Sequence, residues 1–347
     1  MSAVETEAKV TTSNEASNIL EIKDLVKHFP LRRRLRQVIK GDRPSVKAVD
    51  GISFNLQQGE ILGLVGESGC GKTTTGRVVL RLEEPTSGEM IYEGIPYNSL
   101  KPKDMNRLRR HMQIVFQDPY ESMNPRMDLK HIISEPLRIQ KLSKTKEINE
   151  RVVKALEDVE LTPIREFLYR YPHELSGGQR QRAAIARALV LDPSFIVADE
   201  PVSMLDVSIR GGIINVLLNM VHERGVSLMF ITHDLALARH VCDRISVMYL
   251  GQIVEEAESG DLVHKPHHPY TKALIDAVLS PDPRKKSIKP GLKGEIPNPV
   301  NPPSGCRLHP RCPYATEICV KKIPEMVEYE KGHKASCHHV EKTLKMA

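Results

Sequence analysis

The chain has 347 residues, 40% of them apolar, so its length suits one large domain with an appendage, or two domains, around a substantial core. The formal net charge of +6 is mild, and the aromatic content of 4%, with no tryptophan, gives little support to a protein that stacks on nucleic-acid bases. Uninterrupted apolar runs are far shorter than the roughly 20 residues of a membrane helix, so we expect no membrane span.

The N-terminal residues 1–18 are polar and lack the apolar segment of a secretion signal, so we expect a disordered tail there. A basic run follows at residues 31–36, LRRRLR. We interpret it as a solvated loop in preference to a contact with anionic lipid or nucleic acid.

From residue 19 onward, strand and helix patterns alternate, which predicts an α/β fold with a largely parallel sheet and helices on both faces. The expected strands are residues 19–29, 46–65 with a turn at 59–60, 112–117, 195–200, 226–233 and 244–257. Helices are expected at about 71–82, within 127–175, and between the later strands. After about residue 262 the chain is rich in Pro and Gly, which predicts one short helix and then a long irregular segment.

The stretch VGESGCGKTT, residues 65–74, matches the phosphate-loop pattern between an expected buried strand and an expected helix. Glycines let successive backbone N–H groups point inward, Lys72 supplies a charge to the β and γ phosphates, and the Thr73 hydroxyl is a Mg²⁺ ligand. This context makes a chance match rare. The residues expected to bind nucleotide here are Gly66, Ser68, Gly69, Cys70, Gly71, Lys72, Thr73 and Thr74.

Two later strands end in side chains suited to phosphate chemistry. FIVADE, residues 195–200, ends in Asp199, placed to hold Mg²⁺, and Glu200, placed to polarise an attacking water. His233 in ITHD closes another strand, and it could reach a γ-phosphate if both strands end on the same edge of the sheet.

LSGGQ, residues 175–179, opens an expected helix. Taken alone, Ser176 is an ordinary helix cap. In company with the phosphate loop, the stretch predicts a second anion site made of N–H groups, a hydroxyl and a helix dipole. One triphosphate does not need two such sites in one chain, so we expect two chains head to tail. Each would present Ser176, Gly177, Gly178 and Gln179 to phosphate held by the partner's loop.

Together, these motifs in this order resemble the ATP-binding subunit of an ATP-binding cassette (ABC) transporter over about residues 19–260. The resemblance implies a P-loop NTPase core with a mixed sheet, an antiparallel β subdomain and an α-helical subdomain at about 118–185. It also implies roles for further residues: Gln117 as the Q-loop glutamine and a Mg²⁺ ligand, Asp206 as the end of the D-loop, and His233 as the switch histidine. Phe29 matches the aromatic that stacks on adenine, with an ordinary core Phe as the alternative.

Two other stretches, DPYESMNPR after Gln117 and HHPYTKAL at 267–274, resemble the ATPases of oligopeptide and dipeptide importers and imply a C-terminal extension over 261–347. That resemblance implies a paralogous ATPase as heterodimer partner, two membrane-spanning permease subunits, an external solute-binding protein acting indirectly, and no nucleic acid. It also implies a peripheral position on the cytoplasmic side of the cell membrane. Some members import oligosaccharides or nickel, and the ATPase is not expected to touch the solute.

A more distant alternative is a soluble ABC ATPase that acts on nucleic acid or ribosomes. The stretch between Lys72 and Ser176 has no sustained heptads of the kind found in the coiled coils of DNA-repair members. The chain also has one cassette where ribosomal members have two.

The extension contains four of the six cysteines, Cys306, Cys312, Cys319 and Cys337, in a Pro-rich segment with little core of its own. A cytoplasmic ATPase does not favour disulfides. Structural Zn²⁺ usually binds closely spaced Cys pairs, which are missing here, although His309, His333, His338 and His339 keep a zinc site open. Four thiolates with a Cys-Pro step suit a [4Fe-4S] cluster, which members of the resembled group carry at matching cysteines. Free thiols are the third interpretation.

Overall fold

The computed structural model describes residues 17–31, 44–120, 122–142, 144–277 and 291–345. The disordered tail and the basic run expected near the N-terminus therefore lie almost wholly outside the described residues. Within the described ranges, no helix has the length and apolarity needed to cross a membrane.

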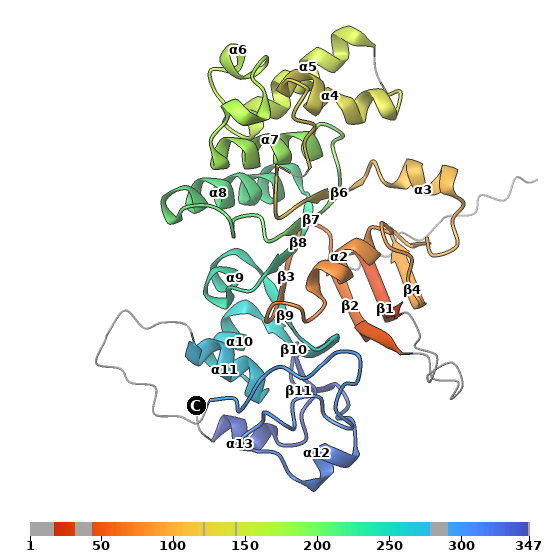
Figure 1. Ribbon diagram of the computed structural model, residues 1–347, viewed down its shortest axis with the longest axis vertical. Coiled ribbons are helices and arrows are strands. Elements are labelled where there is room, and N and C mark those ends of the chain that lie inside the picture. Colours follow the sequence, from red (N-terminus) through yellow and green to blue (C-terminus); the bar gives the residue numbers. More distant parts are fainter. Residues whose placement is uncertain (1–16, 32–43, 121, 143, 278–290, 346–347) are drawn as a thin grey trace, which may run out of the picture.

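A large mixed sheet runs along the molecule (Figure 1). Its central neighbours β9, β3, β8, β7 and β6 pair in parallel, and the strands beyond β9 pair antiparallel. In spatial order the strands are β11 (Val327–Glu330), β12 (His333–Ala335), β10 (Gln252–Glu258), β9 (Arg244–Tyr249), β3 (Ile61–Val65), β8 (Ser227–Thr232), β7 (Phe195–Asp199) and β6 (Met112–Val115). The expectation of a largely parallel sheet therefore holds for its centre only, and the sheet as a whole is mixed.

A second, antiparallel sheet packs beside the first, as expected for an antiparallel β subdomain (Figure 1). In spatial order it contains β2 (Ser45–Gln57), β1 (Asn18–Pro30), β4 (Ser87–Tyr92) and β5 (Ile95–Pro96). The sequence interpretation missed β4 and β5. The expected strand at 46–65 is two strands in different sheets, separated by the turn that was expected at Gly59 and Glu60.

Helices cover the large sheet and extend beyond it at one end. They are α2 (Lys72–Val79), α3 (Pro102–Leu108), α4 (Leu129–Ile139), α5 (Thr145–Asp158), α6 (Ile164–Phe167), α7 (Gly177–Leu189), α8 (Val207–Arg224), α9 (Leu235–Val241), α10 (Ser259–His264), α11 (Pro269–Ala277), α12 (Glu317–Lys321) and α13 (Val340–Leu344), with a 3₁₀ turn at Pro172–Glu174. Helices α4 to α7 form the expected helical region at the top of Figure 1, and α12 and α13 lie at the opposite end.

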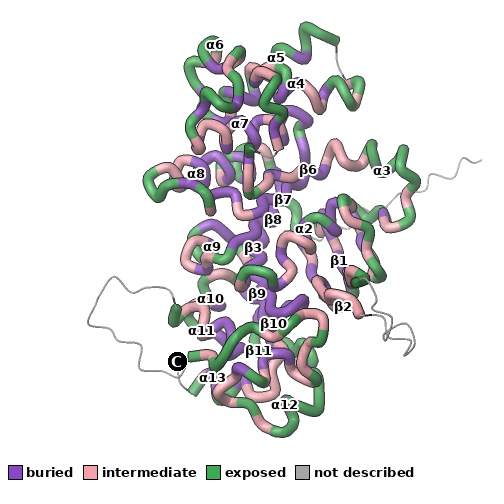
Figure 2. Tube along the Cα trace, in the orientation of Figure 1, coloured by how far each residue is buried: buried purple, intermediate pink, exposed green. Residues whose placement is uncertain are grey.

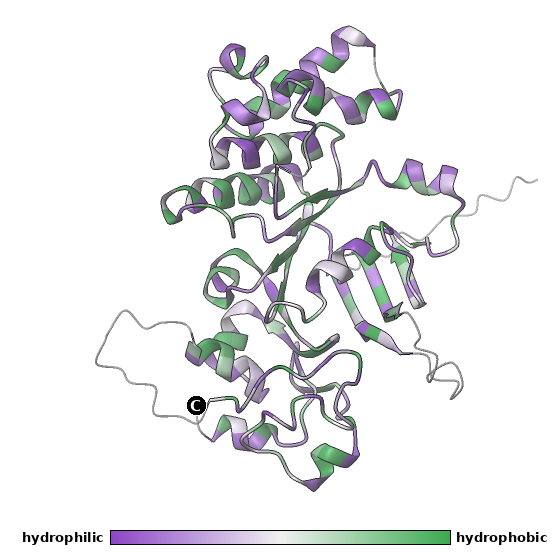
Figure 3. Ribbon diagram, in the orientation of Figure 1, coloured by the Kyte–Doolittle hydropathy of each residue, from purple (hydrophilic) through white to green (hydrophobic). Residues whose placement is uncertain are grey.

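The core lies on both faces of the sheet because its strands alternate. In β3, Ile61 and Val65 pack into the cluster under the helical region, whereas Leu62 and Leu64 pack toward α2 and the antiparallel sheet. Side chains two residues apart share a face of a strand, which is why one strand serves two clusters. Figure 2 shows the central strands buried throughout, and Figure 3 shows them as the most apolar part of the fold.

The C-terminal extension differs from the irregular segment that we expected. Strand β12 pairs antiparallel with β10 of the large sheet, and β11 pairs with β12. The expected strand at 244–257 is likewise two strands, β9 and β10, joined by a turn at Leu250 and Gly251. Strands of three and four residues show no periodicity of their own, so their pairing depends on the edge that β10 offers.

A buried carboxylate fastens the extension to the sheet. Glu255 on β10 is fully buried, and its Oε1 accepts hydrogen bonds from the His267 N–H at 2.6 Å and from His333 Nε2 at 2.8 Å. Its Oε2 accepts from the His268 N–H at 2.9 Å. Because a buried carboxylate needs several donors, these bonds fix both the start of α11 and strand β12 against β10.

Candidate nucleotide site

The phosphate loop follows the buried strand β3 and ends where α2 begins at Lys72. Gly69 and Gly71 have φ of 78° and 113°, which non-glycine residues rarely adopt. A Cβ on Gly71 would lie 2.1 Å from the Ala48 carbonyl oxygen, and one on Gly66 would lie 2.2 Å from that of Met248. The glycines therefore allow both the curl of the loop and its close approach to two neighbouring strands.

Lys72 is 4% exposed, and its Nζ donates hydrogen bonds to the carbonyls of Gly66 at 2.8 Å and Glu67 at 3.0 Å. The ammonium group therefore lies inside the loop, where the helix N-terminus also favours an anion. Cys70, which we expected among the nucleotide-binding residues, points its side chain into the apolar cluster beneath the loop. Its pKa is raised, chiefly by burial.

Two of the three expected magnesium ligands, Thr73 and Asp199, touch each other. The Thr73 hydroxyl donates to Asp199 Oδ1 at 3.0 Å, which joins the start of α2 to the end of β7. Burial raises the pKa of Asp199; the Thr73 bond opposes this, and the charge of Glu200 adds to it. A divalent cation at this position would stabilise the ionised carboxylate.

Three side chains from three elements meet beyond that pair. Glu200 Oε2 accepts a hydrogen bond from Gln117 Nε2 at 3.2 Å, and it lies 3.2 Å from His233 Nδ1. The φ of Glu200 is 46°, a conformation that is uncommon for a non-glycine residue and recurs at functional sites. The structure thus brings together the side chains that the sequence placed at the ends of neighbouring strands.

These residues line one open pocket of about 690 Å³. Among the predicted residues, its lining includes Phe29, Ser68, Gly69, Gly71, Lys72, Thr73, Thr74, Gln117, Glu200 and His233. The sequence interpretation missed Val46, Ala48, Glu67, Leu274 and Pro299, which also line it. Val46 and Ala48 lie two residues apart on β2, next to Phe29, and so share one face of the strand. This alternation could have predicted that they line the pocket with Phe29. Leu274 and Pro299 come from the extension, more than 200 residues after the phosphate loop, and no local signal points to them.

The predicted signature residues lie elsewhere. Ser176 caps α7: its hydroxyl accepts from the Gln179 N–H at 3.3 Å, and Gln179 Oε1 accepts from the Ser176 N–H at 2.9 Å. A Cβ on Gly178 would lie 2.5 Å from Ile209 Cγ2, so this glycine lets α7 approach α8. Of the described residues, neither Gly177 nor any other member of the signature lines the pocket of its own chain.

Asp206, at the N-cap of α8, is exposed and receives no side-chain capping bond. Two large apolar side chains beside it are also exposed, Met204 at 62% and Val207 at 81%. Asp206 therefore lies on an exposed surface with apolar side chains close to it on either side in the chain.

The four cysteines of the extension share one neighbourhood. The Cys306 N–H donates to the Cys319 carbonyl at 2.8 Å. Burial raises the pKa of Cys306 to about 11 and that of Cys337 to about 12, and the charges of neighbouring cysteines add to both shifts. A cation or a metal cluster would favour the thiolate forms that burial disfavours.

The positions of the cysteine sulfurs and histidine rings bear on the zinc alternative. Among the described residues, which include all four cysteines, no three of these sulfurs lie within 4.8 Å of one another. Tetrahedral Zn²⁺ with Zn–S bonds of 2.3 Å would hold its sulfurs about 3.8 Å apart. Each of the four histidines makes a hydrogen bond through one ring nitrogen: His309 with the Cys306 carbonyl, His333 with Glu255, His338 with the Lys322 carbonyl and His339 with Thr316. His333 also belongs to a buried group with Glu255 and His267 whose possible ligand atoms all lie within 4.8 Å of one another.

Comparison with known proteins gives the family. Residues 49–203 match the family described as ABC transporter, and residues 254–319 match the one described as oligopeptide/dipeptide transporter, C-terminal region. The oligopeptide transport ATP-binding protein AppF of Bacillus subtilis is 47% identical, with 95% of this chain and 99% of that protein covered. A putative peptide import ATP-binding protein of Brucella ovis is also 47% identical, over 92% of this chain and 97% of its own length.

The fold is also found among solved structures. The ATP-binding cassette MJ0796, solved as a dimer in a post-hydrolysis state with ADP and Pi, matches with a TM-score of 0.61 and 28% identity. The match covers 69% of this chain and 98% of that one. The chain therefore belongs to the ABC transporter ATPases, as an ATP-binding subunit of the oligopeptide/dipeptide transporter family.

Proposed function

We propose that the chain binds and hydrolyses ATP to drive import of oligopeptides or dipeptides across the cytoplasmic membrane. The observation that carries the proposal is the meeting of Gln117, Glu200 and His233 at the pocket that the phosphate loop enters. A carboxylate held between a glutamine and a histidine is suited to polarise a water molecule beside a γ-phosphate.

The other pocket residues have separate roles in this proposal. Phe29 stacks on the adenine, and Lys72 with the loop N–H groups of residues 66–74 binds the β and γ phosphates. Thr73, Gln117 and Asp199 would hold Mg²⁺, which neutralises charge on the phosphates. Lys72 already points into the loop and Thr73 already contacts Asp199, so little rearrangement is needed to receive the nucleotide.

The signature residues act on a partner chain in this proposal. Ser176, Gly177, Gly178 and Gln179 lie outside the pocket of their own chain, and Asp206 lies among exposed apolar residues, as a head-to-tail pair requires. A cassette solved as a dimer supports this arrangement. We propose a heterodimer with a paralogous ATPase, bound at the cytoplasmic face of the membrane to two permease subunits through the helical region 118–185. An external solute-binding protein takes part indirectly, and nucleic acid does not.

The test is uptake by cells that lack this chain. Labelled tripeptide or dipeptide uptake should fall to background, wild-type chain should restore it, and the Glu200→Gln chain should not. Uptake of nickel or of an oligosaccharide in the same cells serves as the control for cargo. Loss of nickel or oligosaccharide uptake with intact peptide uptake would replace the peptide assignment by one of these cargoes. Unchanged uptake of all three would contradict an importer and favour a soluble ABC ATPase.

We also propose two units, a cassette at 19–260 and an extension at 261–347 whose Cys306, Cys312, Cys319 and Cys337 bind a [4Fe-4S] cluster. The proximity of the four thiols, whose charges raise one another's pKa, supports a shared metal site. Anaerobically purified protein should contain about four irons per chain, and Cys312→Ser should remove them while ATP binding survives. Stoichiometric zinc without iron would support the zinc alternative, and four titratable thiols without metal would support free cysteines.

A further inference from the structure

Glu67 lies in the phosphate loop and is held by groups from the C-terminal extension. Arg311 grips its carboxylate with two hydrogen bonds, Nη1 to Oε2 at 2.9 Å and Nη2 to Oε1 at 3.2 Å. The Glu67 N–H donates to the Tyr270 hydroxyl at 2.8 Å, and its carbonyl accepts from Lys72 Nζ at 3.0 Å. Side chain and backbone of this residue are therefore fixed by three separate elements.

The hydrogen bonds that Arg311 and Tyr270 make with Glu67 have the features of strong polar contacts. Arg311 is 8% exposed and Tyr270 is fully buried, whereas the Glu67 side chain is 29% exposed, so the three bonds to Glu67 are partly sheltered from water. Paired hydrogen bonds between a planar guanidinium and a carboxylate are among the most directional polar contacts in proteins. Removal of one partner leaves the other charged and poorly solvated, which costs more than the loss of an exposed ion pair.

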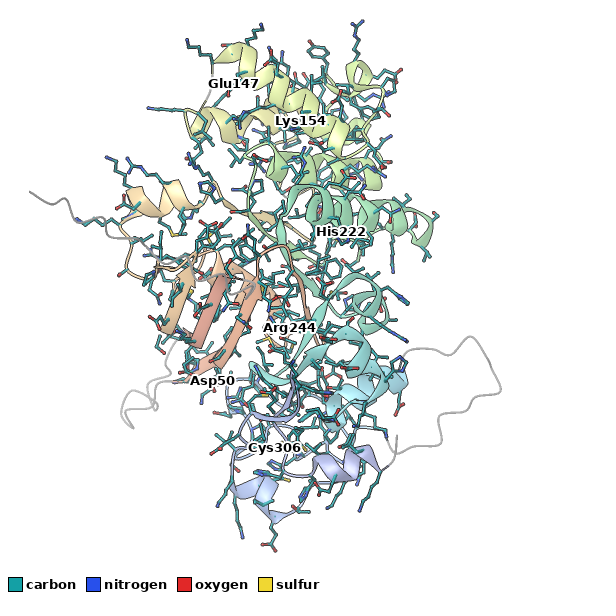
Figure 4. The ribbon with its side chains drawn as sticks, turned by 180° about the vertical axis from the view of Figure 1, so that it is seen from behind. Asp50, Glu147, Lys154, His222, Arg244 and Cys306 are labelled. Carbon is teal, nitrogen blue, oxygen red and sulfur yellow. The ribbon has the colours of Figure 1, made fainter. Side chains whose placement is uncertain are left out.

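A second arginine of the same turn contacts the antiparallel sheet. Arg307 donates to Asp50 on β2 and to the Leu250 carbonyl. Asp50 also lies 2.7 Å from His28 Nε2, and His28 precedes Phe29 in the pocket wall. Figure 4 shows Asp50 at the end of the antiparallel sheet that faces the segment containing Cys306. The same turn of the extension therefore contacts both the phosphate loop, through Arg311, and strand β2, through Arg307.

Because Glu67 is charged, its pairing with Arg311 affects nucleotide affinity. Glu67 lines the nucleotide pocket and also a neighbouring hollow of about 320 Å³ that Arg311 lines. A free carboxylate this close to the phosphate loop would repel a triphosphate. Arg311 neutralises the charge of the Glu67 carboxylate. The Glu67 peptide is held in the conformation in which its carbonyl accepts a hydrogen bond from Lys72 Nζ. Without Arg311, the same carboxylate would oppose binding.

We propose that Arg311 and Tyr270 are positioning residues of the ATP site, which makes the extension a working part of that site. The proposal rests on the proposed ATP-binding function of the loop. Arg311 neutralises Glu67, and Tyr270 holds the Glu67 peptide. Neither group touches the reacting atoms, so both should act on nucleotide affinity and leave the turnover of the saturated enzyme nearly unchanged.

The experiment measures Mg-ATP affinity and the kcat and KM of ATP hydrolysis for full-length variants in the assembled transporter. Arg311→Gln should weaken affinity on the order of tenfold and raise KM by a similar factor, with kcat within about twofold. Adding Glu67→Gln to Arg311→Gln should restore most of the affinity, because the unpaired carboxylate is then gone. Lys321→Gln is the matched control: it breaks an exposed ion pair with Glu317 in the same segment and should change nothing.

Rescue separates positioning from general damage to the extension. If Arg311→Gln acted only by unfolding the extension or releasing metal beside Cys312, Glu67→Gln would not restore affinity, and the proposal would be wrong. Tyr270→Phe leaves the arginines and cysteines in place and should raise KM alone. An unchanged KM there would overturn the role of Tyr270. Lys72→Ala in the same titration tests the proposed ATP site itself. If this variant binds ATP as tightly as wild type, the proposed ATP site is wrong.

Discussion

Replacing Glu200 by Gln tests the assignment of the catalytic carboxylate. The change preserves shape, and the new side-chain oxygen can still accept from Gln117 Nε2 and face His233 Nδ1, both 3.2 Å away in the native site. What it removes is the negative charge that polarises water. Loss of such a general base lowers rates by about 10²–10⁴-fold, which corresponds to about 2.7–5.4 kcal/mol in the activation free energy.

The same substitution should not weaken Mg-ATP binding. The charge of Glu200 helps to raise the pKa of Asp199, although burial is the larger cause. In Glu200→Gln that contribution disappears, so the pKa of Asp199 falls, the carboxylate ionises more readily and a cation is held at least as well. The structure therefore predicts slow turnover with retained nucleotide.

Phosphate release by the assembled transporter and equilibrium titration with Mg-ATP measure the two effects separately. Glu317→Gln, whose side chain is 90% exposed on α12, is the matched control and should behave as wild type. Turnover within about threefold of wild type would refute the role of Glu200 in water activation. A parallel loss of nucleotide binding would instead show that Glu200 holds the site together.

Three further substitutions test other parts of the molecule. Lys72→Ala removes the charge that lies inside the loop and should weaken ATP binding at least about tenfold in a titration. Ser176→Arg should leave ATP binding by the isolated chain within about twofold but prevent the ATP-bound pair in size-exclusion chromatography. Loss of binding by the folded monomer would argue against a shared site. Glu255→Ala leaves three buried donors without an acceptor and should lower the free energy of unfolding by about 3–5 kcal/mol in denaturant titrations. A variant as stable as wild type would contradict the anchoring role of Glu255.

Much of the catalytic site was predictable because its residues lie in short motifs at strand ends. Asp199 ends a buried strand, Glu200 and His233 each follow one, and parallel strands bring their carboxyl ends to one edge. The glycines of the phosphate loop and the helix after it have an equally local signal. Sequence alone did not show the capping box between Ser176 and Gln179, although Ser176 was recognised as a candidate cap.

The contacts of the extension could not be predicted because they join residues far apart in the chain. Arg311 and Glu67 are 244 residues apart in the sequence, and no local pattern near either residue predicts the bonds between them. Strand β11 is exposed at all four positions, so it has no apolar alternation to reveal it. Such elements form because a neighbouring edge and a buried acceptor exist, and these arise only in the folded molecule.

The pairing of β12 with β10 also determines how far the chain can be shortened. A chain that ends near residue 260 would leave the β10 backbone unpaired on one side and lack all three histidines that bond Glu255. An open sheet edge recruits strands from other molecules. A cassette cut at that boundary should therefore self-associate, whereas one that keeps residues up to 345 retains a short outer strand whose Glu328 and Glu330 discourage a further copy from adding on.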